Sequence, residues 1–191
     1  MKILQIITPI VISLGILSAN AQTEVPQGFS KGKLILADGS TVSGYIKDNI
    51  RRDASVSFIN ETDKKKKDFE GTELNGVEMN NTRFVCIQGD FFTVMTEGDL
   101  SFLQKSSDAS GKVVYNGLEN TVSNGTEGKM GDYFIYNGNT HQLRKITKKN
   151  VNELAVNVFS GCNAAQDKIR ASNGDMASIK DAVEIYNSRN K

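Results

Sequence analysis

The sequence is poor in the residues from which most catalytic and metal sites are built. It has no tryptophan, one histidine, His141, and two cysteines, Cys86 and Cys162. A structural zinc ion needs about four Cys or His ligands at close spacings, so no metal site is expected. A Ser-His-Asp or Cys-His arrangement would have to use His141. We expect that residue in a hairpin opposite Phe134, in cross-strand packing or exposed, and we predict no catalytic residue and no cofactor.

An excess of positive charge is also lacking. The chain has 23 Lys and Arg against 22 Asp and Glu, and removal of Lys2 with a signal peptide would leave 22 of each sign. The one basic run, residues 64–67, lies between Asp63 and Asp68. We expect it to be a solvated strand end or loop, the alternative being contact with an anionic surface. A nucleic acid partner would favour a basic surface and is not predicted.

Residues 1–21 have the features of a signal peptide. They contain Lys2, an apolar run through Leu17 and a small-residue cleavage site ending at Ala21. The apolar run is short for a membrane span, and an uncleaved anchor is the alternative. We expect cleavage after Ala21, no transmembrane span in the product, and a periplasmic or secreted location. Residues 22–30 are then a short polar linker.

Residues 31–47 predict a β-hairpin around Asp38 and Gly39. A three-residue loop with Gly39 at positive φ places the apolar side chains of both strands on one face, whereas a two-residue loop would split them. These side chains are Leu34, Leu36, Val42 and Ile46. Gly44 shares that face and leaves room for a bulky neighbour. Because only one face is strongly apolar, we place the hairpin at the flank of the sheet.

The densest core signal is a meander of three strands over residues 82–88, 91–96 and 99–105. Two-residue turns at Gly89-Asp90 and Glu97-Gly98 would join them. Both faces of the middle strand are apolar, which is typical of a covered strand and places the meander at the centre of the sheet. Farther on, Asn137-Gly138 predicts a turn that returns residues 140–146 along residues 133–136.

After residue 146 the apolar period changes from two to 3.6. Three short amphipathic helices are predicted, one beginning at Val151, one ending at Asn173-Gly174, and one starting at Met176 with Asp175 as its cap. Such helices are unstable alone and must pack on one another or on the sheet. The fold class is therefore α+β, an antiparallel curled sheet or small barrel over residues 31–146 with a helical tail over residues 147–191 packed on it.

Several short patches carry a resemblance to a known group. They are Gly44-Tyr45-Ile46, the meander end GDLSFLQK, Cys162 with the closing Glu184-Ile185-Tyr186-Asn187, and the cleavage site Ala19-Asn20-Ala21-Gln22. With these patches the chain resembles a loose group of uncharacterised secreted proteins of Bacteroidota. The resemblance implies a cell-envelope location and a β-rich domain followed by helices, and it brings no functional residues.

Three sets of residues are candidates for a site. Cys86 and Cys162 permit a disulfide in an exported protein, although we favour two separately buried thiols because nothing fixes their distance. The nearest approach to an acid cluster is Asp90, Glu97 and Asp99, all at expected turns. Four tyrosines could line a groove, namely Tyr45, Tyr115, Tyr133 and Tyr136.

The favoured function is a non-catalytic binding or interaction module of the cell envelope. Its partner would be another envelope protein or a small apolar ligand. The alternatives are a carboxylate-based hydrolase, which needs two acids converging in one cleft, and a structural component that self-associates through a sheet edge or the helical tail.

Overall fold

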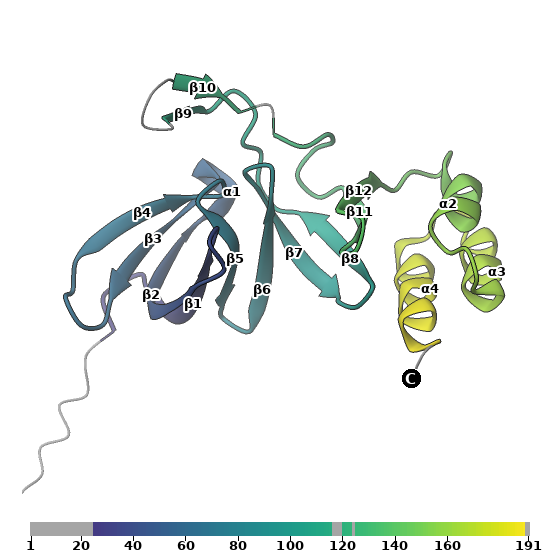
Figure 1. Ribbon diagram of the computed structural model, residues 1–191, viewed down its shortest axis with the longest axis horizontal. Helices are drawn as coiled ribbons and strands as arrows, with labels where there is room; N and C mark the ends of the chain where they lie inside the picture. The colour runs from purple at the N-terminus through teal and green to yellow at the C-terminus, as the bar shows by residue number, and fades with distance from the viewer. Residues whose placement is uncertain (1–24, 116–119, 124, 190–191) are drawn as a thin grey trace, which may run out of the picture.

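The computed structural model describes residues 25–115, 120–123 and 125–189. The expected signal peptide, residues 1–21, lies outside these ranges. Ten strands form one antiparallel sheet that curls without closing, and helices follow it, which confirms the α+β class (Figure 1). The strands of this sheet are β1 (Ser30–Leu36), β2 (Thr41–Asn49), β3 (Ser55–Asn60), β4 (Lys66–Glu70), β5 (Leu74–Met79), β6 (Thr82–Ile87), β7 (Asp90–Thr96), β8 (Leu100–Lys105), β11 (Tyr133–Asn137) and β12 (Gln142–Lys145).

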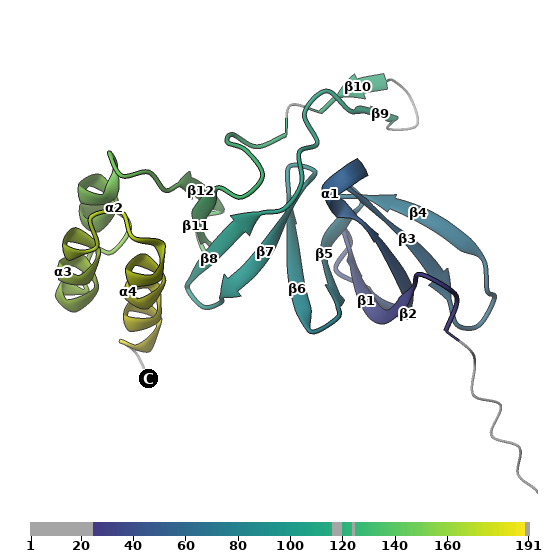
Figure 2. The same cartoon turned by 180° about the vertical axis from the view of Figure 1, so that it is seen from behind.

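The order across the sheet is β12-β11-β8-β7-β6-β5-β1-β2-β3-β4. Strand β1 lies between β5 and β2, so the first strand joins the N-terminal hairpins to the meander. A separate hairpin, β9 (Val113–Tyr115) with β10 (Asn120–Val122), extends from the loop between β8 and β11 (Figures 1 and 2). The helices are α1 (Ile50–Asp53), α2 (Val151–Asn157), α3 (Asn163–Ala171) and α4 (Met176–Ser188).

The first hairpin has the predicted three-residue loop. Leu34 pairs with Val42, Leu36 N–H donates to Ser40 O at 2.8 Å, and Gly39 has φ of +85°. A Cβ on Gly44 would lie 2.6 Å from the Phe58 ring, so the missing side chain admits that ring. The predicted place at the flank is wrong, because β1 pairs with β5 and β2 pairs with β3. The second face stays largely exposed, with Lys33, Ser43 and Lys47 at the surface, although Tyr45 on it is only 3% exposed.

The meander forms, but its first turn is one residue earlier than predicted. Gln88 and Gly89, with φ of +51° and +86°, make the turn, and Asp90 begins β7. Val85 therefore pairs with Phe92 rather than Val94. The register shift is two residues, so the paired side chains of β6 and β7 keep their predicted faces. The second turn is followed by a bulge between Val94 and Thr96.

The hairpin of β11 and β12 has a four-residue loop in place of the predicted two-residue turn. Asn137 pairs with Gln142, and Phe134 pairs with Lys145 rather than with His141. His141 lies in the loop with φ of +53°, where its Nδ1 is 2.9 Å from the Tyr136 hydroxyl. The side chain of Asn137 accepts the N–H groups of Asn139 and Thr140, which stabilises the longer loop.

The three C-terminal helices are confirmed close to their predicted bounds. The Asp175 carboxylate accepts the Ser178 N–H at 2.9 Å and caps α4. Their apolar stripes pack against Leu100, Phe102 and Ile135, on β8 and β11. In Figure 2 the helices stand beyond β8, β11 and β12, at the end of the sheet opposite β4.

Two hydrophobic clusters lie on one face of the sheet, here called the inner face. The first, which includes Leu34 and Phe84, fills the curl of strands β1 to β6 under α1. The second lies under the C-terminal helices and includes Phe102. Cross-strand pairs link the two clusters along the inner face, from Phe84 to Thr93 to Gln104. Gln104 lies two residues after Phe102 on β8 and therefore shares its face. The inner face is thus polar between its two clusters.

Candidate functional site

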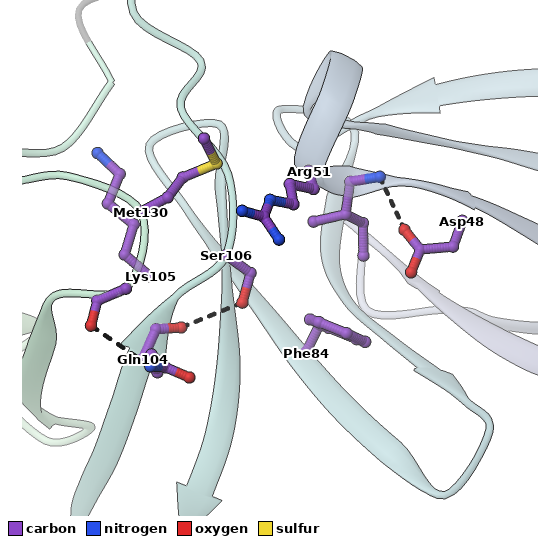
Figure 3. A pocket seen from close by; sticks show the side chains of 9 residues that line it. Asp48, Arg51, Phe84, Gln104, Lys105, Ser106 and Met130 are labelled. Atoms are coloured by element: carbon purple, nitrogen blue, oxygen red, sulfur yellow. Dashed lines mark hydrogen bonds between the residues drawn. The ribbon is translucent and has the colours of Figure 1, made fainter.

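A hollow of about 340 Å³ lies over this polar part of the inner face. Four segments of the chain form it, namely the turn into α1, strand β6, the end of strand β8, and the loop before β11 (Figure 3). We call it the Arg51 cleft. Its lining includes the side chains of Asp48, Arg51, Phe84, Gln104, Ser106 and Met130.

Local structure at the end of β2 fixes the direction of Arg51. Asp48 Oδ1 accepts the Ile50 N–H at 2.8 Å, and Ala54, with φ of +45°, ends the helix by donating its N–H to Ile50 O. Ile50 is 2% exposed and anchors the turn in the core. The next residue, Arg51, is exposed, and Figure 3 shows its guanidinium extending toward Ser106 and Met130.

Arg51 has no ion pair and no hydrogen bond from its guanidinium within the described part of the chain. Its neighbour Arg52 differs, because Arg52 Nη2 lies 2.6 Å from Asp53 Oδ2 and Nε also donates to that carboxylate. The Asp48 carboxylate is engaged with backbone on the far side of the turn (Figure 3). The cleft therefore contains a cation whose five N–H donors face solvent.

The floor of the cleft contains a hydroxyl group with hydrogen-bond partners, that of Ser106, and an amide oxygen without one, that of Gln104. Ser106 Oγ lies 2.7 Å from Thr93 Oγ1 and donates to Gln104 O at 3.2 Å. Gln104 Nε2 donates to Gly131 O at 3.4 Å, whereas Oε1 of the same amide accepts no hydrogen bond from any described residue. Phe84, 8% exposed, gives the floor an aromatic edge.

A buried ion pair holds in place the loop before β11, which forms one wall of the cleft. Lys105 Nζ and Asp90 Oδ2 are 3.0 Å apart, and both side chains are 0% exposed. Asp90 also accepts the Ala109 N–H at 2.6 Å and the Thr126 N–H at 2.7 Å, while Lys105 donates to Thr126 O at 2.8 Å and Gly128 O at 3.3 Å. The pair thereby fastens the loop that carries Met130 to the sheet. The Lys105 ammonium points into this network and away from Arg51.

The three acids considered as the nearest approach to a cluster do not converge. Asp90 begins β7 and is buried, while Glu97 and Asp99 follow the other end of that strand. Glu97 pairs with Arg83 at 2.5 Å, and Asp99 pairs with Arg189 at 3.1 Å. Two of the three acids therefore serve surface ion pairs, and the third serves the buried network.

The four tyrosines do not line a common groove. Tyr45 is buried on β2, which five strands separate from β11. Tyr133 stacks on Phe102 at a centroid distance of 5.4 Å, under the helical tail. Tyr136 lies on the opposite face of β11, and Tyr115 belongs to the separate β9–β10 hairpin. The alternation of side chains along β11 and the order of strands in the sheet therefore keep the four tyrosines apart.

Cys86 and Cys162 are both free thiols in the structure. Cys86 packs against the cluster in the curl, and Cys162 belongs to the cluster under the helices. Burial raises the pKa of the Cys86 thiol. Among the residues that the structure describes, no three Cys, His, Asp or Glu side chains gather in a way that would hold a metal ion.

The residues of the cleft were not candidates on sequence grounds. Arg51 is one of two adjacent arginines in a polar turn, and Gln104 lies in an ordinary strand. The only sequence signal is that Asp48-Asn49 precedes Ile50, a pattern typical of a capped turn. Which of the two arginines remains unpaired depends on the geometry of α1.

Comparison of the chain with protein-family models, curated proteins and solved structures gave no match. Across the described ranges, none of the helices combines the length and the apolar character that a membrane span requires.

Proposed function

We propose that this chain is an exported, non-catalytic binding module of the cell envelope and that the Arg51 cleft is its binding site. The envelope location is supported by the signal-peptide features of residues 1–21 and by the resemblance to secreted proteins of Bacteroidota. The binding role is supported by the cleft. Small-ligand sites are concave and have a few well-placed polar groups, typically within about 300 to 1,000 Å³.

One observation carries the proposal, the unpaired guanidinium of Arg51 over a hollow built from four separate segments of the chain. Folding does not need this cation, because Ile50 and the Asp48 hydrogen bond already fix the turn. An exposed arginine alone would be ordinary. Its position above a free amide oxygen and an aromatic edge is what favours recognition of a ligand.

The other functions have less support. The cleft is lined by charged and amide groups, which do not favour a small apolar ligand. A carboxylate hydrolase would require converging acids, and Asp90, Glu97 and Asp99 lie apart. Self-association through the β4 edge is disfavoured because Lys66, Lys67 and Asp68 are exposed there, and charges on an edge strand oppose pairing.

Position-resolved photocrosslinking in intact cells tests the proposal. A photoreactive amino acid replaces Met130, which lines the cleft and is 46% exposed. The matched control replaces Met95 on β7, which is 43% exposed and lies outside the cleft lining. We expect a discrete adduct from position 130 and none from position 95. Equal labelling from both positions, or none from position 130, would refute the binding role of the cleft.

A further inference from the structure

We infer that the Arg51 cleft recognises a carboxylate that stands next to an amide N–H and a small apolar side chain, the chemistry of an acylated amino acid or of the last residue of a peptide. The inference rests on the proposed binding role and names the class of ligand for the same site. It follows from three groups that the described structure leaves available at the cleft.

The charge of the ligand follows from Arg51. A planar guanidinium with all its donors open matches a carboxylate through two parallel N–H···O bonds. Two other charges belong to the lining. The Lys105 ammonium is bound by Asp90 and three backbone carbonyls. The Asp48 carboxylate accepts the Ile50 N–H on the far side of the turn from Arg51 (Figure 3). One cation with a fork geometry favours one carboxylate over a polyanion, which would call for several cations.

The second feature of the ligand follows from Gln104. One of the two N–H groups of its Nε2 donates to Gly131 O, whereas its Oε1, an acceptor, has no partner among the described residues. If Arg51 binds the carboxylate of a ligand, Gln104 Oε1 can accept a hydrogen bond from an amide N–H of the same ligand. A simple anion such as sulfate has no donor for that oxygen and would leave it unpaired.

Size and apolar contact complete the description. Phe84 and the half-exposed Met130 provide the apolar surface of the cleft, and methionine adapts readily to side chains of different shape. A volume of about 340 Å³ is at the small end for ligand sites. A cleft of this size accommodates one or two residues of a ligand. The rest of a longer bound peptide would extend through the open side into solvent.

Nitrogen-15 NMR titration of the purified exported chain tests the ligand class. The probes are N-acetyl-leucine, its uncharged match N-acetyl-leucinamide, and sodium sulfate, all at constant ionic strength. We expect N-acetyl-leucine to shift the Arg51 Nε–H and Gln104 amide signals to saturation. The leucinamide should bind at least about 10-fold more weakly, because a charge-assisted hydrogen bond pair is lost.

Three variants assign the effect to Arg51. Arg51→Gln should reduce affinity for N-acetyl-leucine about 10-fold or more, and Arg51→Lys should reduce it measurably because an ammonium lacks the fork. Arg52→Gln removes the same charge one residue away, from a side chain paired with Asp53, and should leave affinity unchanged. An acetylated tetrapeptide ending in leucine distinguishes the two sources. Tighter binding of the tetrapeptide indicates a peptide end, and equal binding indicates a small acylated amino acid.

The inference is overturned if the leucinamide binds as well as the acid, if sulfate displaces N-acetyl-leucine at equal concentration, or if Arg51→Gln binds like the parent chain. A discrete adduct from position 130 with no carboxylate binding would leave the binding role intact and remove only this ligand class. If neither the adduct from position 130 nor binding of N-acetyl-leucine is observed, the binding role itself is refuted.

Discussion

Replacing Asp90 by asparagine should be among the most damaging single changes in the chain. Asp90→Asn leaves the Lys105 ammonium, 0% exposed, without its counter-charge. It also turns an NH₂ group toward the Ala109 N–H or the Thr126 N–H, because one of the two acceptor oxygens is lost. Breaking a buried ion pair on one side costs about 3 to 5 kcal/mol, a large part of the stability of a typical domain.

Urea unfolding of the parent and variant chains measures this cost. The control is Asp99→Asn, which removes an exposed ion pair with Arg189 and should cost no more than about 1 kcal/mol. Adding Lys105→Met to Asp90→Asn removes the stranded charge and should recover part of the loss, because replacing both partners is far less costly than removing one.

Hydrogen exchange shows where the cost falls. The side chains of Asp90 and Lys105 bind the backbone of Ala109, Thr126 and Gly128. The amides of residues 108–110 and 125–130 should therefore lose protection in Asp90→Asn before those of the sheet. Our reasoning is refuted if Asp90→Asn costs no more than Asp99→Asn, or if Lys105→Met brings no recovery.

Other predictions concern single groups with clear contacts. The pKa of Asp132 lies below its usual 3.8, mainly because its carboxylate accepts the Lys129 N–H and also because it binds the Lys145 ammonium. The ionised carboxylate therefore stabilises the fold above about pH 4, and this contribution is lost as the pH falls through the lowered pKa. The melting temperature deficit of Asp132→Asn should therefore shrink between pH 6 and pH 3, and a constant deficit would contradict this. Gly44→Ala places a methyl group 2.4 Å from Ile59 O and should cost more than about 2 kcal/mol by urea unfolding, whereas Gly138→Ala, with nothing within 4 Å, should stay within about 0.5 kcal/mol. Since burial raises the pKa of the Cys86 thiol, Ellman's reagent should react with it only after unfolding, and fast reaction in the native chain would count against its burial.

Much of the fold could be predicted because local patterns and packing agree. The loop of the first hairpin follows from placing Leu34 and Val42 on one face, and the helices follow from their 3.6 period. Turns that depend on distant contacts could not be located in this way. The first meander turn lies at Gln88-Gly89 because Asp90 belongs to a network with Thr126, 36 residues away.

The cleft was beyond sequence reasoning for a related reason. Whether Arg51 or Arg52 stays unpaired is decided by a helix of four residues and by the place of Asp53 on it. The free oxygen of Gln104 depends on Gly131, which reaches the cleft only because the buried pair holds its loop. Motif reasoning looks instead for His, Cys or paired acids, and these groups turned out to serve packing, turns and ion pairs.

The central claim, that the Arg51 cleft is where this protein binds, is tested most directly by combining the crosslinking probe with the two arginine variants. The photoreactive residue stays at position 130, and the chain carries either Arg51→Gln or Arg52→Gln. Our account predicts that the adduct survives in Arg52→Gln and is lost in Arg51→Gln, with both variants equally well folded. An adduct of equal yield in both variants would contradict it.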